Sequence, residues 1–256
     1  MPTQIILQAR TGSTRLPNKM LMPFHEGKGI LQILLERIRS AFPEGFDRIT
    51  VATTTSPGDD RIAELCAGTG FRCFRGSESD VLERFIGAAE EAGADRIIRV
   101  CADNVFLDTA ALRSLYDRIE RENADYASFR TSAGVPSIKT HYGFWAEGVT
   151  LDALHRVRKA TDEAIYHEHV TNYIYTHPED FTIDLRPISD TIEGIENYPD
   201  LRLTIDTRED FDISREIYAT LSECGNGIKT TDILSYLDGR ADLFARMRTV
   251  INQNTK

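Results

Sequence analysis

The sequence predicts an α/β protein in which a mostly parallel sheet carries helices on both faces. In the first half of the chain, short apolar runs alternate with longer segments whose apolar residues recur at helical spacing, and this order is typical of such a sheet. Hydrophobic residues make up 41% and charged residues 27% of the chain, which are ordinary values for a globular protein. The 256 residues are enough to bury a large apolar core.

Short apolar runs predict the strands. In chain order we expect strands at residues 5–9, 49–53, 71–74, 96–101, 124–128, 181–185 and 201–205. Helical patterns separate the first four runs, so we expect these strands to lie parallel to one another.

The segments between the strands are amphipathic. In residues 30–39, Leu31, Leu34, Leu35 and Ile38 fall on one face of a helix. An aspartate placed just before such a pattern favours a helix start. Further helices are expected after Asp59–Asp60, from Asp80, at 109–121 after Asp108, at 151–160, at 163–177, from near Glu209, at 233–237 and at 243–251.

The chain shows no internal repeat, low-complexity tract or linker, so we expect one domain over residues 1–256. The strand–helix alternation is interrupted by an insertion at about 129–150 and by an excursion at about 187–200. Both carry aromatic and apolar side chains outside the alternation, as a subunit interface would, and we therefore expect a homodimer. These side chains are Phe129, Tyr142, Phe144, Trp145, Ile188, Ile192, Ile195 and Tyr198.

Charge and hydropathy exclude several classes of protein. Lys and Arg number 30 against 40 Asp and Glu, and the net charge of −10 disfavours a nucleic-acid partner. The longest apolar runs fall far short of the ~20 residues that a membrane span needs. Residues 1–4 show no basic stretch followed by an apolar one, so we expect a cytoplasmic protein. The four cysteines (Cys66, Cys73, Cys101, Cys224) stand singly, and we expect them to be reduced and mostly buried.

The loop after the first predicted strand has a phosphate-binding composition. Residues 8–19 include the cations Arg10, Arg15 and Lys19, together with Gly12, which lets the backbone approach an anion closely. The glycine spacing of neither the Walker loop nor the dinucleotide fingerprint is present. A solvated basic loop is the alternative, but ligands of parallel sheets bind beyond the carboxyl ends of strands, and this position favours phosphate binding.

Two aspartates follow predicted strands and are candidate metal ligands. Asp103 comes after the strand at 96–101. It is not needed as a helix cap, because Asp108 is better placed to cap the next helix. Asp206 comes after the run at 201–205 and could either bind a cation or cap the helix that follows. Carboxylates at strand ends can hold a divalent cation against a triphosphate.

Several motifs together resemble a known family. The chain carries QARTGSTRLPNK at 8–19, ATTTSPGDD at 52–60, RGSESDVLER at 75–84, ADN at 102–104, HEHVTNYI at 167–174 and IDTRED at 205–210. Over about residues 4–220 it resembles the cytidylyltransferase family of the spore coat polysaccharide biosynthesis protein F, which is similar to the synthetases that activate ulosonic acids as CMP-sugars.

The resemblance implies a nucleotidyltransferase-type fold, Rossmann-like and GT-A-like, with a small inserted subdomain for dimerisation or acceptor binding. It implies Mg²⁺-dependent transfer of CMP from CTP to an oxygen of a sugar or sugar-acid acceptor, with release of pyrophosphate. The implied catalytic residues are Arg10, Arg15, Lys19 and Asp103, and the implied metal ligands are Asp103 and Asp206. The implied nucleotide-binding residues are Gln8, Ala9, Arg10, Gly12, Ser13, Lys19, Thr53, Arg75, Ser77 and Ala102, and the implied acceptor-binding residues are Tyr142 and Glu147.

The chain departs from the family pattern in two places. The proline expected after the acidic loop is replaced, because Asp103 is followed by Asn104 and Val105. The stretch at 141–147 keeps a glycine and a glutamate but contains unusual aromatic residues. Because of these departures, the alternative remains open that the protein binds nucleotide but has lost catalysis.

Two other enzyme classes can be weighed from short motifs. A glycosyltransferase of related fold would need a D-x-D pair at a strand end, and the chain has D-x-D only at Asp210–Asp212, within a predicted helix. A zinc hydrolase built on His167 and His169 is disfavoured, because residues two apart on a helix point in different directions. We expect both histidines at the surface or at a dimer contact.

Overall fold

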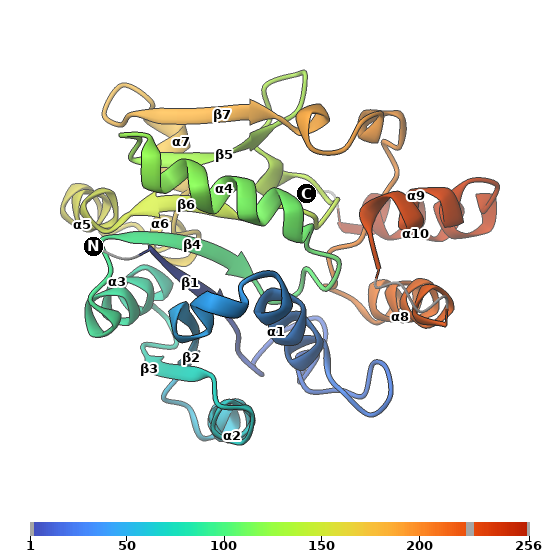
Figure 1. The fold of residues 1–256 in the computed structure, drawn as a ribbon, viewed down its shortest axis with the longest axis horizontal. Helices are drawn as coiled ribbons and strands as arrows, with labels where there is room; N and C mark the ends of the chain where they lie inside the picture. Colours follow the sequence, from blue (N-terminus) through green and yellow to red (C-terminus); the bar gives the residue numbers. More distant parts are fainter. Residues whose placement is uncertain (1–2, 224–227, 255–256) are drawn as a thin grey trace.

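The computed structural model describes residues 3–223 and 228–254. Within these residues, seven strands form one sheet in the order β3-β2-β1-β4-β6-β5-β7 (Figure 1). Strands β1 to β4 are parallel where they pair, β5 and β7 are parallel, and only β6 runs antiparallel to its neighbours β4 and β5. The strands are β1 (Thr3–Gln8), β2 (Ile49–Thr54), β3 (Arg72–Gly76), β4 (Arg96–Cys101), β5 (Tyr126–Arg130), β6 (Glu147–Thr150) and β7 (Ile183–Pro187).

Helices cover both faces of the sheet, which confirms the predicted fold class. The α-helices are α1 (Ile30–Ala41), α2 (Asp60–Thr69), α3 (Val81–Ala92), α4 (Thr109–Arg121), α5 (Leu151–Ala160), α6 (Ala164–Glu168), α7 (Asn172–Thr176), α8 (Arg208–Ser222), α9 (Thr230–Leu237) and α10 (Ala241–Asn254). Alternate residues of β1 serve two cores. Ile5 and Leu7 join the core that includes α1 and α4, while Ile6 joins the core that includes α3 and α5.

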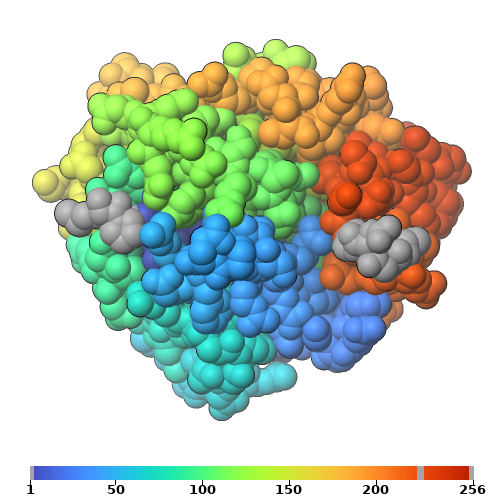
Figure 2. Space-filling view, in the orientation of Figure 1, coloured from blue at the N-terminus to red at the C-terminus, as the bar shows by residue number. Residues whose placement is uncertain are grey.

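The C-terminal helices lie together on one side of the molecule (Figures 1 and 2). Helix α8 packs Phe211 and Ile217 into the core that also contains β1 residues. The hydroxyl of Thr207 caps its N-terminus, and Asp210 completes a capping box. None of the helices in the described part of the chain has the length and apolar character needed to cross a membrane.

Two parts of the strand prediction were wrong. Strand β6 was not expected, because residues 147–150 fall in the predicted insertion. Residues 201–205 form no strand. The N–H of Leu203 donates to the carbonyl of His141 (2.8 Å) and the N–H of Ile205 donates to that of Asp103 (3.2 Å), so the segment pairs with two loops rather than with the sheet. Gly143, at φ 74°, lies close enough to the Leu203 backbone that a side chain would crowd it.

The single helix predicted at 163–177 is divided into α6 and α7. Between them the chain turns, with the N–H of Asn172 donating to the carbonyl of His169 (2.7 Å). The buried hydroxyl of Thr171 donates to the Glu147 carboxylate (2.8 Å). This inward bond diverts the backbone from a helical path and directs residues 169–171 toward the sheet.

The side chains from which an interface was predicted belong to the chain's own core. Phe129, Phe144, Ile188 and Ile195 are each at most 1% exposed, and only Tyr198 of the eight is not buried. They therefore give no support for an interface, and the homodimer stays a prediction. Cys66, Cys73 and Cys101 are free, as expected, but only Cys66 is buried, and Cys73 and Cys101 are partly exposed. Cys224 lies outside the described residues.

Helix α6 is tied to the start of α3 by His167. One ring nitrogen, Nδ1, lies 2.6 Å from Asp80 Oδ2, and Nε2 lies 3.0 Å from the carbonyl oxygen of Thr161. Burial alone would lower the pKa of His167, but the Asp80 carboxylate and the Thr161 carbonyl raise it above its usual value. Both partners are acceptors, so the doubly protonated imidazolium is the favoured form.

This contact predicts pH-dependent stability. Because the folded-state pKa is raised, the stabilisation is complete below the unfolded-state value of about 6.5 and is lost as pH rises through the folded-state pKa. We expect His167→Gln to lower the unfolding free energy at pH 6 by about 1.5 to 3 kcal/mol, the range for a hydrogen bond to a charged group. The difference from wild type should shrink toward pH 9 in urea titrations. His155→Gln serves as the control, and a pH-independent difference for His167→Gln would contradict the assignment.

Candidate active site

The carboxyl ends of β1 and β4 lie side by side, with Gln8 opposite Cys101, and a cleft opens beyond them. The cleft has a volume of about 340 Å³. It is lined by Gln8, Arg10, Ser13, Thr14, Arg15, Lys19, Met20, Arg99, Cys101, Ala102, Asp103, Glu168, His169 and Asp206. The first loop, both candidate metal ligands and the turn after α6 therefore meet at one place, as expected for a parallel sheet.

Lys19 lies at the centre of the charged groups in this cleft. Its Nζ is 3.1 Å from Asp103 Oδ2 and 3.5 Å from Asp206 Oδ1, and it donates to the carbonyl of Ile205. The side chain is only 7% exposed. Burial would lower the pKa of Lys19, but the two carboxylates raise it, so the ammonium stays charged at neutral pH.

Asp206 is surrounded by cations. Burial would raise its pKa, but Lys19, Arg15 and Arg202 together lower it. Arg15 Nη2 lies 3.1 Å from Asp206 Oδ1, and Arg202 Nη2 donates to Oδ2 (3.0 Å). Arg202 is almost fully buried and is also paired with Asp210 of α8, so the helix holds Asp206 in place. The capping role left open for Asp206 belongs to Thr207 instead.

The local structure of the first loop explains how Lys19 reaches the sheet. The carbonyl of Thr11 accepts from the N–H of Ser13 (2.9 Å) and from that of Asn18 (2.9 Å), which closes the loop on itself. Asn18 adopts φ 61°, a left-handed conformation that asparagine tolerates better than most residues. The chain then returns to the cleft at Lys19.

Glu147 lies beneath the cleft and does not line it. The carboxylate is 1% exposed and forms an ion pair with Arg99, which does line the cleft. It also accepts from Tyr126 Oη (2.5 Å) and from Thr171 Oγ1 (2.8 Å). Burial would lower the pKa of Arg99, but the neighbouring groups, including Glu147, raise it. Glu147 thus fixes a charged side chain of the cleft and the turn that carries His169.

A second pocket, of about 320 Å³, adjoins the first. It shares Arg99, Cys101, Asp103, His169 and Asp206 with the cleft. Its other walls are Asn104, Ser137, Ile138, Lys139, Thr140, His141, Gly143, Trp145 and Thr204, mostly from the predicted insertion. Tyr142 does not line this pocket. It is 8% exposed and packs edge-on against Trp145.

Only some of the remaining predicted nucleotide-binding residues line the cleft. Gln8, Arg10, Ser13 and Ala102 line the cleft with Lys19, whereas Ala9 and Thr53 are fully buried in and after the strands. Gly12 faces the loop after β3, where an added Cβ would lie 3.5 Å from Glu78. Arg75 pairs with Asp60 and with the carbonyls of Thr54 and Ser56, and Ser77 caps the backbone N–H of Asp80. Nucleotide binding by these residues stays a prediction.

Sequence reasoning missed Arg99, Glu168 and His169. All three line the cleft. The two histidines at 167 and 169 were expected at the surface or a dimer contact, yet His169 lies in the cleft because the helix ends one residue earlier. The HEHVTNYI motif was the available signal for this turn.

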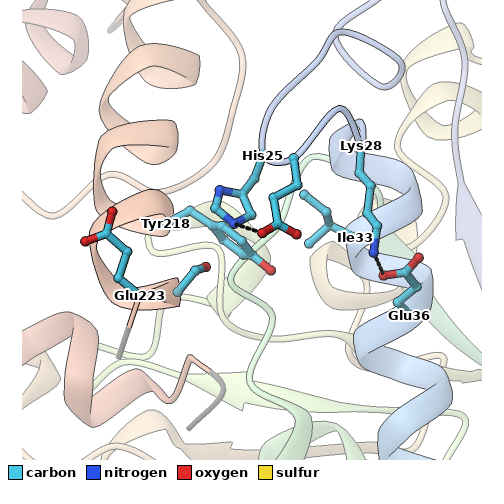
Figure 3. Close-up of a pocket in the computed structure, with 8 residues that line it drawn as sticks. His25, Lys28, Ile33, Glu36, Tyr218 and Glu223 are labelled. Atoms are coloured by element: carbon cyan, nitrogen blue, oxygen red, sulfur yellow. Dashed lines mark hydrogen bonds and ion pairs between the residues drawn. The ribbon is translucent and has the colours of Figure 1, made fainter. Parts of the chain in front are cut away.

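Another cavity, of about 310 Å³, lies away from the strand ends, between the hairpin at His25, α1 and α8 (Figure 3). Its lysine, Lys28, is paired with Glu36 at 2.8 Å. None of the residues that line the cleft lines this cavity, and it holds no cluster of strand-end carboxylates. The chemistry is therefore expected at the cleft.

The cleft fits a divalent cation brought in with a phosphate ligand. Asp103 and Asp206 both contact one ammonium group, so two carboxylates are already gathered. In residues 3–223 and 228–254 no group of three or more His, Cys, Asp or Glu could hold a metal alone. A site with two carboxylates, completed by phosphate oxygens and water, is typical of Mg²⁺. The zinc-hydrolase alternative finds no ligand cluster in the described part of the chain.

Comparison with known proteins decides the family. A family model described as cytidylyltransferase matches residues 4–235. The chain belongs to the cytidylyltransferase family. This confirms the resemblance and makes the protein a nucleotidyltransferase. The D-x-D pair lies on helix α8, with Asp210 held by Arg202, so the glycosyltransferase alternative gains no support.

One curated relative and two solved structures match most of the chain. The spore coat polysaccharide biosynthesis protein SpsF of Bacillus subtilis is 32% identical over 93% of this chain and 94% of its own length. A cytidylyltransferase structure from Leptospira borgpetersenii matches with a TM-score of 0.81 at 24% identity, covering 100% and 98% of the two chains. A CMP:2-keto-3-deoxy-manno-octonic acid synthetase complexed with CTP matches with a TM-score of 0.63 at 14% identity, covering 86% and 100%. The two structures establish the fold.

The buried pair beneath the cleft predicts a large effect on stability. Glu147→Gln removes the carboxylate and leaves the Arg99 guanidinium, with its side chain 7% exposed, without its countercharge. We expect the unfolding free energy to fall by about 3 to 5 kcal/mol, measured by urea denaturation. Glu122→Gln, which breaks an exposed pair with Arg186, should cost under about 1 kcal/mol. Equal small losses in both variants would contradict a buried ion pair between Glu147 and Arg99.

Proposed function

We propose that the protein catalyses Mg²⁺-dependent transfer of CMP from CTP to an oxygen of a sugar or sugar-acid acceptor, with release of pyrophosphate, for surface polysaccharide synthesis. The observation that carries the proposal is the cluster of Lys19, Arg15, Asp103 and Asp206 at the carboxyl ends of β1 and β4. The proposal draws further support from the relatives named for polysaccharide biosynthesis and for a CTP complex.

The reaction needs no nucleophilic side chain. The acceptor hydroxyl oxygen attacks the α-phosphorus and loses its proton to water, the bond from the α-phosphorus to the bridging oxygen breaks, and pyrophosphate leaves with the negative charge. Arg10, Arg15 and Lys19 line the cleft and supply positive charge to the phosphates. Because these cations are held before the substrate arrives, they stabilise charge that develops on the leaving group at little reorganisation cost.

Asp103 and Asp206 would hold the Mg²⁺ ion. When bound, the ion neutralises triphosphate charge and orients the phosphates for in-line attack. In this structure the Lys19 ammonium keeps the two carboxylates together. The two aspartates can therefore receive a cation without first being gathered from separate loops.

The second pocket is the proposed acceptor site. It reaches Asp103 and Asp206 on one side and carries Arg99, Lys139 and His141 on its walls. Burial and Arg202 lower the pKa of His141, and its Nδ1 lies 2.8 Å from Arg202 Nη1. His141 is therefore neutral at pH 7, with Nε2 as the protonated nitrogen. These donors suit hydroxyl and carboxylate oxygens of a sugar acid.

The test of the proposed function is a pyrophosphate-release screen. Each nucleoside triphosphate is incubated with Mg²⁺ and a panel of acceptors: eight- and nine-carbon sugar acids, neutral sugars and a phosphonate. We expect release with CTP and a sugar or sugar acid, and a product containing CMP by mass spectrometry. Pyrophosphate release that does not depend on an acceptor, or none from CTP with the whole panel, would contradict the proposal.

The first loop predicts losses in turnover. Lys19→Ala and Arg15→Ala should lower kcat as well as weaken CTP binding, because these contacts strengthen as charge develops on pyrophosphate. A charge-assisted contact in such a site is worth about 2 to 4 kcal/mol, or roughly 30- to 1000-fold in kcat/KM. Lys28→Ala, at an exposed pair with Glu36, is the control. Losses under about threefold in both loop variants would fit surface electrostatics alone.

We predict that substituting Asp103 lowers turnover in a way that depends on the Mg²⁺ concentration. Asp103→Asn should keep the fold, judged by circular dichroism, and lower turnover by about 100-fold or more. Substituting a residue that only hydrogen-bonds to a metal ligand already lowers metal affinity or activity by about 10- to 100-fold. Turnover is measured across a Mg²⁺ titration. If Asp103→Asn turns over at the wild-type rate at limiting Mg²⁺, the assignment of Asp103 as a metal ligand is contradicted.

A further inference from the structure

Asp59 lies outside the cleft but is bonded to the loop that forms it. The residue ends the short 3-10 helix η2 (Pro57–Asp59) after β2 and is 2% exposed. Oδ1 accepts from the N–H (2.7 Å) and the hydroxyl (2.6 Å) of Thr11. Oδ2 accepts from the N–H (3.2 Å) and the hydroxyl (2.5 Å) of Thr54. The carboxylate therefore joins the loop after β1 to the end of β2.

This role differs from the one expected. The sequence pattern predicted Asp59 as a helix-start residue. The residue does precede α2, but its side chain makes no capping bond to that helix. A helix start does not need a buried carboxylate that accepts four hydrogen bonds from the first loop and the end of β2, so the bonds to Thr11 call for another explanation.

Thr11 transmits the position of Asp59 to the rest of the first loop. Its carbonyl accepts from the N–H groups of Ser13 and Asn18, both at 2.9 Å, while its own N–H and hydroxyl are held by Asp59. Asn18 directly precedes Lys19. The fit is close, because a Cβ on Gly58 would come within 3.1 Å of the Thr11 hydroxyl. One carboxylate oxygen thus fixes the residue about which the loop closes.

The other oxygen is anchored to the sheet. Thr54 is the last residue of β2, and its hydroxyl also accepts from the N–H of Ser56 (3.1 Å). The Thr54 carbonyl accepts from Arg75 Nε (2.9 Å), on β3. Asp59 is therefore bonded to the end of β2, and through it the first loop is tied to the sheet.

The charge of Asp59 matters to this arrangement. Burial would raise its pKa, but the Thr11 and Thr54 donors lower it, so the group is ionised at neutral pH. An asparagine has one oxygen and one NH₂ group. In Asp59→Asn the NH₂ group must face a backbone N–H, either of Thr11 or of Thr54, and one of the two anchors is lost.

We propose that Asp59 is a positioning residue for nucleotidyl transfer: its buried carboxylate sets the first loop so that Lys19 and Arg15 meet the triphosphate. The inference rests on the proposed function. Asp59 is not among the residues that line the cleft, and it acts through Thr11.

The experiment compares Asp59→Asn with Asp125→Asn. Asp125 also receives a backbone N–H, from Thr182 (2.8 Å), and pairs with Arg156, at the start of β5 and away from the cleft. Steady-state kinetics with CTP, urea denaturation and hydrogen–deuterium exchange of the peptide over residues 10–19 are measured for both. We expect Asp59→Asn to lower kcat by about 100-fold, the effect of a small misplacement of catalytic groups, and to speed exchange in that peptide. Asp125→Asn should lose stability but retain both kcat and the exchange rate.

Thr11→Val separates positioning from general stability. It removes the hydroxyl bond but keeps the Thr11 N–H, so its kcat should lie between those of wild type and Asp59→Asn, and the double variant should be no worse than Asp59→Asn alone. Equal kcat in the Asp59 and Asp125 variants, unchanged exchange in Asp59→Asn, or additive effects with Thr11→Val would each overturn the proposal. If the wild type transfers no CMP, the proposed function fails, while the exchange comparison still decides whether Asp59 orders the loop.

Discussion

The structure depends on holding two aspartates and their cations together at one edge of the sheet. Asp103 and Asp206 would repel each other if they were gathered alone, and the 7%-exposed Lys19 side chain offsets that repulsion. Three separate parts of the chain must converge for this contact: the first loop, the end of β4 and the segment before α8. A site of this kind favours a polyanion with a divalent cation, because positive and negative groups are both in place before the ligand arrives.

The irregular parts of the fold are explained by this convergence. Residues 201–205 leave the sheet and bond to the loops at His141 and Asp103, which brings Asp206 beside Lys19. Arg202 then ties Asp206 to the first turn of α8. Beneath the cleft, Glu147 fixes Arg99 and the turn at Thr171. A regular strand at 201–205, or a continuous helix through 169, would have placed these groups elsewhere.

The elements defined by local pattern could be predicted from the sequence. Strand β4 and helix α4 match their expected bounds, and Asp80 and Asp108 cap the helices they precede. Strand β6 could not be found, because its four residues include Gly148 and a buried Glu147 and so lack an apolar run. The partners of Glu147 and Asp59 are distant in sequence, up to 48 residues away, and no local signal identifies such pairs. The composition of the first loop indicated phosphate binding, but not that Lys19 joins both aspartates.

The most direct test of this account is a crystal structure with Mn²⁺ and a non-hydrolysable CTP analogue, using the anomalous signal of manganese. We expect the metal peak between Asp103 and Asp206, with the triphosphate against Lys19 and Arg15 in the cleft beyond β1 and β4. A metal peak away from both aspartates, or a nucleotide bound in the cavity beside Tyr218, would contradict it.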